Sequence, residues 1–423
     1  MRNSLARFTC ALGFFLVIAF HAPVSAAISL QVEADGVERV NTPVTVELAV
    51  PAQISQEDAA KWKNSGAVLM PGNVPVQVEP VSDAQGNVGN VGKVSKVSKV
   101  LLHWVEPSLK KDEKKTYELA AAKEASKSAK FSVVDTENTR DLKLGDQLIW
   151  RHDVLKYDPA NHVPTFKHFH QIYDMHGNGF ITQGVDGKQF PHHRGLYMGW
   201  AKTGFNGQSY DTWHCTKNVA LKHQEFLPLR ETLGNVIARS VSVADWKTGD
   251  DKTILTEERT VTTWPVDKGD LVLDFHFKLT SGGGDVKLDG DPQHAGFQFR
   301  AHGDVGASKA KYIYPAQVKG GKGDVWENCA WVVNQFTIKS NPYAVAHFDH
   351  PKNPGTAEGK TVYSTRNYGR FGAYASVMLK ADTPLEFNYR ILVRDAALHD
   401  ETSVEYYQNL HSSWVKPVKV TVK

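Results

Sequence analysis

Runs of alternating apolar and polar residues constrain this chain more than any other feature. Seven runs rich in β-branched residues follow this pattern, at residues 44–50, 99–105, 236–246, 254–264, 271–279, 343–348 and 385–393. Such alternation is typical of half-buried antiparallel strands. Turn sequences such as TGDD, DKGD and SGGGD lie between runs and fit hairpin loops. The pattern predicts a mainly β protein with a large antiparallel β-sandwich (a supersandwich) and few helices.

Helical signal is confined to two segments. Residues 57–62 (EDAAKW) form a short candidate, and residues 402–414 (TSVEYYQNLHSSW) form a better one with apolar residues at helical spacing. Thr402 is the expected N-cap of the second helix.

The first 26 residues have the features of a secretory signal peptide. Arg2 and Arg7 precede a short apolar stretch, and small residues at 24–26 (VSA) predict cleavage after Ala26. No other stretch approaches the roughly 20 apolar residues of a transmembrane helix. We expect a periplasmic or secreted protein without membrane insertion.

Charge and cysteine content limit the partners further. Of the 49 Lys and Arg residues two lie in the signal segment, so 47 remain against 46 Asp and Glu. A balance near zero favours neither nucleic acid nor an anionic membrane as partner. Cys215 and Cys329 remain after cleavage, and the sequence leaves open whether they pair or stay free thiols.

Two low-complexity stretches divide the chain. Residues 86–100 carry a three-residue repeat that reads as a long hairpin arm, and residues 110–130 are rich in lysine and alanine. We therefore expect a small N-terminal β domain at 27–127 and a large antiparallel β-sandwich domain at 128–423.

Histidines gather in one part of the large domain. Nine of the 18 fall within one segment, namely His152, His162, His168, His170, His176, His192, His193, His214 and His223. Histidine is suited to proton transfer near neutral pH and is a common metal ligand. The clustering makes a shared cleft plausible, although His168 and His170 also fit an ordinary strand face.

The sequence FPHHRG contains the first candidate site. In an extended segment His192 and His193 point to opposite faces, unless the backbone bends as Pro191 and Gly195 would favour. Arg194 could bind a carboxylate or a sulfate through its planar fork. The alternative is a structural loop in which Arg194 makes an internal ion pair.

A second candidate group is DTWHC. Asp211 could orient the imidazole of His214, and Trp213 is either a sugar-stacking surface or a core residue.

Residues 291–302 form a third group, with a polar and an apolar face. The polar face carries His294, Gln298 and Arg300, as expected of a strand that lines a binding groove. Turns farther along add further polar candidates: Asp349, His350, Asn353, Arg366, Tyr368 and Arg370.

Familiar catalytic motifs do not occur in the sequence. There is no HExxH, CxxC pair, GxSxG or glycine-rich phosphate loop in a strand–helix context. The HxH at His168 and His170 is a weak metal signal without a third ligand at fixed spacing. We therefore expect no cofactor, with a metal ion as the alternative.

The order and spacing of PHHRGLYMGW, DTWH, DPQHAGFQFRA and AHFDHPKNP…RNYGRFG resemble a bacterial secreted family of unknown function commonly labelled "methane oxygenase PmoA". The membrane subunit of that name has several spanning helices, whereas this chain has none after its signal segment. The resemblance implies a β-sandwich protein of polysaccharide-degrading bacteria, similar to the supersandwiches of sugar mutarotases and polysaccharide lyases.

These observations lead to three hypotheses. The first is an exported carbohydrate-active enzyme of lyase, dehydratase or epimerase type, because the clusters contain no obvious carboxylate pair of the kind a glycosidase uses. Asp211 and Asp349 could still form such a pair in space. The second is a non-catalytic glycan-binding protein with Trp200, Trp213 and Tyr368 as stacking surfaces, and the third is a metal-dependent enzyme. In the first, the substrate is a neutral or anionic carbohydrate and the catalytic candidates are His192, His193, His214 and His294. The substrate-binding candidates are Arg194, Asp211, Trp213, Gln298, Arg300, Asp349, His350, Asn353, Arg366 and Tyr368.

Overall fold

The computed structural model describes most of the chain after residue 27. The described residues are 28–49, 66–81, 99–122, 128–187, 190–266, 269–306, 309–318, 321, 323–355, 361–398 and 403–423. The predicted signal peptide, the candidate helix at 57–62, most of the hairpin arm at 86–100 and the boundary at residue 127 lie outside them.

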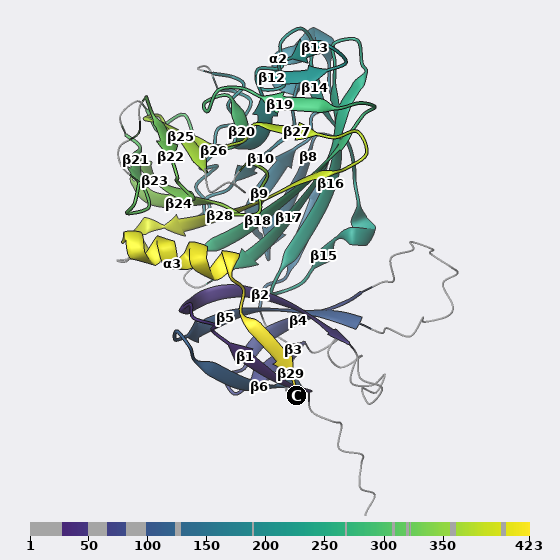
Figure 1. Cartoon of the computed structure of the whole chain (residues 1–423). Helices are drawn as coiled ribbons and strands as arrows, with labels where there is room; N and C mark the ends of the chain where they lie inside the picture. The colour runs from purple at the N-terminus through teal and green to yellow at the C-terminus, as the bar shows by residue number, and fades with distance from the viewer. Residues whose placement is uncertain are drawn as a thin grey trace, which may run out of the picture.

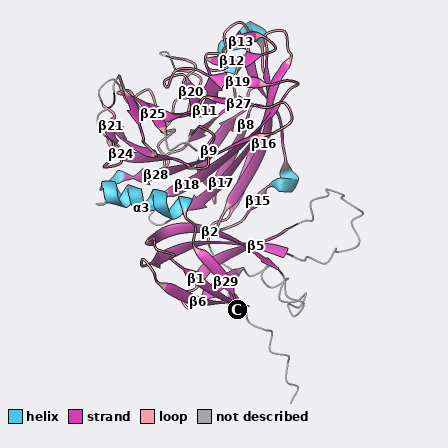
Figure 2. Ribbon diagram, in the orientation of Figure 1, coloured by secondary structure: helices cyan, strands magenta, loops and turns pink. Residues whose placement is uncertain are grey.

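The fold is mainly β, as predicted, and its strands form four antiparallel sheets in the described part of the chain (Figures 1 and 2). The first sheet lies at the bottom of Figure 1. Its strands, in spatial order, are β2 (Arg39–Ala49), β5 (Lys99–Leu109), β4 (Val74–Pro80), β3 (Ala67–Met70), β6 (Lys114–Ala121), β1 (Ile28–Glu33) and β29 (Lys419–Val422).

Two larger sheets form the sandwich above it. One has the order β22 (Val325–Glu327), β25 (Val362–Arg366), β26 (Arg370–Tyr374), β20 (Ala295–Arg300), β11 (Leu196–Trp200), β10 (Phe169–Ile172), β9 (Gln147–Asp153), β8 (Thr139–Leu144), β7 (Phe131–Asp135). The other has the order β14 (Ala220–Phe226), β16 (Ala238–Lys247), β17 (Thr253–Pro265), β18 (Leu271–Ser281), β28 (Leu385–Asp395), β24 (Asn341–Asp349), β23 (Trp331–Ile338), β21 (Lys311–Ile313), with β15 (Thr232–Leu233) beside β16. A fourth, small sheet orders β13 (Gln208–Tyr210), β12 (Lys202–Phe205), β19 (Val286–Asp289) and β27 (Val377–Leu379).

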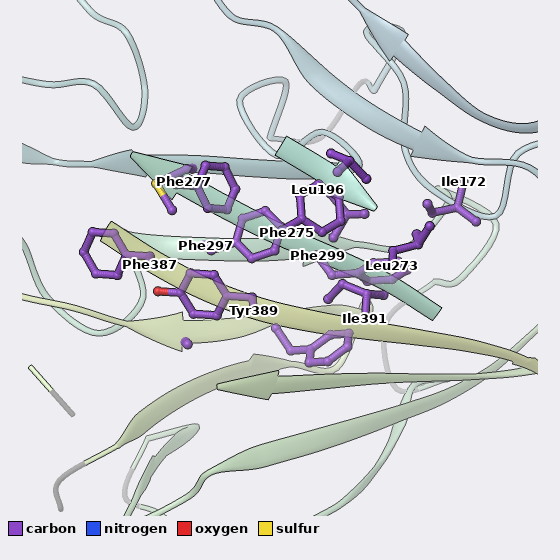
Figure 3. Packing of buried hydrophobic residues seen from close by; sticks show 14 of the residues in the cluster. Ile172, Leu196, Leu273, Phe275, Phe277, Phe297, Phe299, Phe387, Tyr389 and Ile391 are labelled. Carbon is purple, nitrogen blue, oxygen red and sulfur yellow. The ribbon is translucent and has the colours of Figure 1, made fainter. Parts of the chain in front are cut away.

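The main core lies between the two larger sheets (Figure 3). Phe297 of β20 has its ring centroid 5.0 Å from those of both Phe275 and Phe277 on β18. Tyr389 of β28 lies 5.1 Å from the same ring. Each such fully buried aromatic side chain contributes roughly 1.5–3 kcal/mol to folding. Packing of these alternating positions fixes which face of β20 turns outward.

The period-two runs of the sequence correspond to strands. The runs at 236–246, 254–264 and 271–279 fall on β16, β17 and β18, which pair in succession as a meander. The TGDD sequence forms the turn between the first two, where the amide of Thr248 donates to the carbonyl of Lys252 at 2.9 Å. The strand prediction is thus confirmed where β-branched alternation is longest.

Helices are few in the described residues. They are α2 (His162–Thr165), α3 (Val404–Val415) and the short 3-10 turns η1 (Pro159–Asn161), η2 (Pro228–Arg230) and η4 (Ala396–Leu398). The predicted C-terminal helix is confirmed as α3, but its N-cap is Ser403, whose side chain accepts from the amide of Tyr406. Neither α-helix is long and apolar enough to cross a bilayer.

Helix α3 lies at the border of the first sheet and the sandwich (Figure 1). Arg39 of β2 is fully buried and donates to the carbonyls of Ser413 (2.9 Å) and Lys416 (2.6 Å) at the end of α3. After α3 the chain returns to the first sheet, where β29 pairs with β1. We propose that residues 27–127 form a small β domain to which this last strand is added. The sandwich domain is then the part of the chain between residue 127 and β29.

Candidate functional site

A cavity of about 460 Å³ is lined by residues in and next to β11, β20, β25 and β26, and it is far larger than two other hollows of about 70 and 30 Å³ in the described structure. It is lined by Phe190, His192, His193, His214, His294, Asp324, Arg366, Asn367, Tyr368 and Arg370. Four histidines from three separate sequence motifs therefore share one cavity.

The loop before β11 bends sharply and carries two of these histidines. Phe190 and Gly195 have φ angles of 57° and 40°, and the amide of His193 donates to the carbonyl of Phe190 at 2.9 Å. A Cβ on Gly195 would lie 1.9 Å from the carbonyl oxygen of His170, so only glycine fits. Because the backbone is not extended here, both His192 and His193 line the cavity.

His214 forms a tight pair with an aspartate on its own turn. Its Nδ1 lies 2.8 Å from Oδ2 of Asp211, and its backbone amide donates to Oδ1 of the same residue at 2.8 Å. Burial raises the pKa of Asp211, but the hydrogen bonds from His214 outweigh it and hold that pKa below its ordinary value. The carboxylate thus stays ionised and fixes the imidazole with Nε2 as its remaining nitrogen.

His294 repeats this arrangement on another element. Its Nδ1 lies 2.9 Å from both carboxylate oxygens of Asp291, three residues earlier in the turn that enters β20. Hydrogen bonds from His294 and the amide of Gln293 outweigh burial and lower the pKa of Asp291. Two His–Asp pairs with the same i,i+3 spacing therefore face one cavity, their imidazole centroids 5.4 Å apart.

The imidazoles of His192 and His193 extend this group of rings from His214. The His192 centroid lies 4.4 Å from that of His214 and 4.2 Å from that of His193. Burial, reinforced by the charge of Lys167, lowers the pKa of His192 to about 3. Burial also lowers the pKa of His193 well below its ordinary value. Both imidazoles therefore stay neutral near pH 7.

Lys167 places a positive charge behind this row. Its side chain is buried, its Nζ donates to the carbonyl of Trp213, and burial lowers its pKa to about 8. Sequence inspection did not single it out, because a lysine beside a strand is ordinarily exposed.

The cavity lining also includes an aromatic pair next to His193 and two guanidinium groups. The rings of Phe190 and Tyr368 stack with centroids 5.4 Å apart, and Phe190 is 36% exposed. Arg366 pairs with Asp324 at 3.0 Å, whereas Arg370 is buried and donates to Gln298 and Ser364.

Several predicted ligand-binding residues have structural contacts instead. Arg194 is fully buried and donates to the carbonyls of Pro191, Pro164 and Val163, so it anchors the loop rather than binding a ligand. Trp200 and Trp213 are also fully buried, which rules them out as exposed stacking surfaces. The apolar face predicted for residues 295–301 lies in the core. Gln298 and Arg300 are buried on the opposite face, where Gln298 accepts a hydrogen bond from Arg370, a residue that lines the cavity.

The group at 349–353 belongs to a different part of the fold. Asp349 accepts from Nδ2 of Asn353 at 2.6 Å, and its backbone carbonyl lies 3.0 Å from Nε2 of His411 on α3. His350 contacts Trp414 of the same helix, with ring centroids 5.0 Å apart. None of the three predicted residues in this group lines the cavity. Although their motif follows the others in the sequence, these three residues are not part of the site.

Cys215 and Cys329 are both free and buried. Within the described residues no group of three or more His, Cys, Asp or Glu side chains is arranged to hold a metal ion.

Some lining residues carried little sequence signal. Phe190 and Asn367 lie within the sequences FPHHRG and RNYGRFG but were not singled out, and Asp324 lies in no motif. Arg370 was noted only as a polar residue near a turn. Asp291 could have been found, because its spacing to His294 equals that of Asp211 to His214. A repeated D-x-x-H spacing was the available signal.

Fold and cavity together define a large antiparallel β-sandwich protein with a histidine-lined cavity. The chain belongs to the family described as "Family of unknown function (DUF6807)", whose model matches residues 139–408 and so includes every residue that lines the cavity. That description carries no methane oxygenase label. A search of curated proteins finds no match to the chain.

Solved structures are similar only at a distance. A protein in glycosyl hydrolase family 38 from Enterococcus faecalis shares 12% identity over 94% of this chain and 47% of its own, with a TM-score of 0.45. An alpha-mannosidase from Enterococcus faecalis V583 shares 12% over 94% and 46%, with a TM-score of 0.43. A GalM/aldose epimerase homologue from C. elegans shares 9% over 62% and 97%, with a TM-score of 0.28. This chain spans about half the length of the first two, and at these scores the likeness does not bear on function.

Proposed function

We propose that this protein is an exported carbohydrate-active enzyme that transfers protons with its cavity histidines, in a reaction of lyase, dehydratase or epimerase type. The observation that carries the proposal is the pair of His–Asp units, His214 with Asp211 and His294 with Asp291, facing one cavity. A histidine oriented by a carboxylate is a recurrent general base and acid, since the carboxylate fixes the tautomer and stabilises the imidazolium.

Two such units can serve as the base and the acid of one reaction. In an elimination, Nε2 of one neutral imidazole takes the proton from a carbon next to a carbonyl or carboxylate. The C–H electron pair becomes a new C=C bond, and the leaving oxygen departs with a proton from the other, protonated imidazole. In an epimerisation the second imidazole instead returns a proton to the opposite face of the carbon. His192 lies beside His214 and stays neutral, so it would act as a hydrogen-bond partner of the substrate.

The sugar class is supported by the walls of the cavity. Its volume suits a small saccharide, and polar side chains dominate its lining. The stacked pair of Phe190 and Tyr368 offers an aromatic surface for the apolar face of a sugar ring. The same aromatic pair favours the alternative of a non-catalytic glycan-binding protein. Export to the periplasm or the exterior is part of the proposal and depends on residues 1–26.

The test is turnover of a panel of neutral, uronate-containing and sulfated oligosaccharides. Turnover is detected by the ultraviolet absorbance of unsaturated products and by NMR. His214→Gln should lower turnover by about 10²–10⁴-fold, since it removes general acid–base catalysis. His276→Gln is the matched control, because His276 also pairs with a carboxylate (Glu386, 3.3 Å) but lies outside the cavity.

Three outcomes decide between the readings. Turnover that is lost in His214→Gln and kept in His276→Gln supports an enzyme. Binding without turnover on any sugar supports the glycan-binding alternative. Turnover that survives in His214→Gln contradicts the assigned role.

A further inference from the structure

Two buried arginines face each other on the polar side of the β22–β7 sheet. Arg300 of β20 and Arg370 of β26 are direct partners in the antiparallel register, so their side chains start from neighbouring positions on one face. They are 4% and 1% exposed, and within the described residues neither has a carboxylate within 4.0 Å. Arg370 also lines the cavity.

This arrangement is unfavourable for the protein alone. Like charges directly opposite each other destabilise a sheet, and burying a charge without an opposite partner is costly. Burial lowers the pKa of Arg300 below its ordinary value. Two other buried arginines of the sandwich do have carboxylates, since Arg259 pairs with Glu257 at 2.7 Å and Arg394 with Asp270 at 2.9 Å. The fully buried Arg194 is held by three backbone carbonyls instead.

The two guanidinium groups are held in place by neutral acceptors. Nη1 of Arg370 donates to Oε1 of Gln298 at 3.0 Å and to Oγ of Ser364 at 2.7 Å. Nη1 of Arg300 donates to the carbonyl of Tyr368, and its guanidinium carbon lies 4.6 Å from the centre of the Tyr368 ring. These contacts fix the position of both groups without neutralising their charge.

Further buried polar atoms around the arginines lack a protein partner among the described residues. They are both ring nitrogens of His193, the hydroxyl of Tyr197, Nε1 of Trp213, and Nε of Arg300 and of Arg370. The His193 ring lies 6.0 Å from that of Tyr197, 5.9 Å from that of Trp213 and 6.3 Å from that of Tyr368. The Tyr368 ring is the one that Arg300 contacts, and Arg370 is the register partner of Arg300, so these groups are neighbours. Apart from one nitrogen of His193, every one of these atoms can donate a hydrogen bond.

We propose that Arg300 and Arg370, with His193 and Tyr197, form an oxyanion subsite at the base of the cavity that takes the carboxylate or sulfate group of an anionic sugar. Positive charge, fixed donors and no carboxylate are the features that such a group needs. The inference rests on the proposed function and narrows its substrate class to anionic sugars. For a uronate, the same arginines would stabilise the charge that develops on the carboxylate when the neighbouring proton is removed.

The test measures Kd by calorimetry for four probes at fixed ionic strength: glucuronate, glucose 6-sulfate, glucose and inorganic sulfate. The full-length mature protein should bind at least one anionic sugar about tenfold or more tightly than glucose. The two sugar arms separate a carboxylate site from a sulfate site. Arg370→Gln should remove the preference for anionic sugars over glucose. Arg370→Lys keeps the positive charge but lacks the planar fork of the guanidinium group. Arg230→Gln is the charge-matched control, because Arg230 is exposed, pairs with Glu258 and does not line the cavity.

Each outcome has a distinct meaning. Equal Kd values for glucose and both anionic sugars, or a preference that survives in Arg370→Gln, would overturn the subsite, as would no binding of any anionic probe. Binding of inorganic sulfate that depends on Arg370 but no binding or turnover of any sugar would retain the subsite and refute the proposed function. The wild-type comparison needs no variant, so the inference stays testable if Arg370→Gln does not fold.

Discussion

His347 offers a quantitative test of the buried histidines in this fold. It lies on β24, is fully buried among Phe297, Tyr363 and Tyr389, and its Nδ1 is 2.9 Å from the Tyr363 hydroxyl. Burial lowers its pKa to about 3. Since the ordinary pKa of histidine is about 6.5, between pH 6.5 and pH 3 His347 binds a proton in the unfolded chain but not in the folded protein. Stability is therefore fully present above pH 6.5 and is lost as pH falls toward 3.

The size of the effect follows from proton linkage. One proton taken up on unfolding costs about 1.4 kcal/mol per pH unit, so His347 should cost roughly 2 kcal/mol between pH 6.5 and pH 5. His347→Phe removes this dependence. The Tyr363 hydroxyl keeps a partner in the variant, because it also donates to the backbone carbonyl of residue 347 at 3.0 Å.

The assay is urea unfolding of both proteins at several pH values from 7.5 to 5. The difference in free energy of unfolding between them should stay constant above pH 6.5 and change by roughly 2 kcal/mol in favour of the variant by pH 5. Taking the difference cancels groups that act oppositely, such as Asp349, whose burial raises its pKa to about 7. Any constant packing cost of the larger ring offsets the difference equally at every pH and so does not affect its change with pH. Parallel curves over the whole range would refute the reasoning.

Two further variants test how the fold positions the site. Gly195→Ala should lower stability by about 3 kcal/mol or more, because its Cβ would lie 1.9 Å from a backbone oxygen. Gly207→Ala, with a φ of 74° and nothing within 4 Å, should cost only about 1 kcal/mol, and equal losses in thermal unfolding would count against the argument. Arg39→Met should free the end of α3 by removing its donors to two carbonyls there, so limited proteolysis should cleave the C-terminal segment faster than in wild type. Unchanged cleavage would show that the helix is held by other contacts.

The strands were predictable because their signal is local. Alternation from Leu271 to Leu279 reports one buried face, and β18 spans the same residues. The N-cap of α3 was misplaced by one residue because Thr402 and Ser403 are both suitable caps, and only the backbone angles at Ser403 decide between them.

The site was only partly predictable because sequence order does not fix which way a side chain faces. The four histidines were found from their motifs, and the bend at Gly195 brings both His192 and His193 to the cavity. Arg194 was chosen for its chemistry, but the same bend turns it toward backbone carbonyls. The pairing of Arg300 with Arg370 depends on the register of strands 70 residues apart in the chain, which no short motif reveals.

The central claim is that one His–Asp unit removes a proton from a sugar carbon and the other supplies a proton to the leaving oxygen or to the carbon. The most direct measurement is hydrogen exchange of sugar C–H groups in D2O, followed by proton NMR, for wild type, Asp211→Asn, Asp291→Asn and the control His276→Gln. The account predicts loss of one C–H signal, or formation of a deuterated product, in wild type and control. It predicts that both processes slow by about 10²–10⁴-fold in each aspartate variant. Exchange at the wild-type rate in both variants would contradict the account.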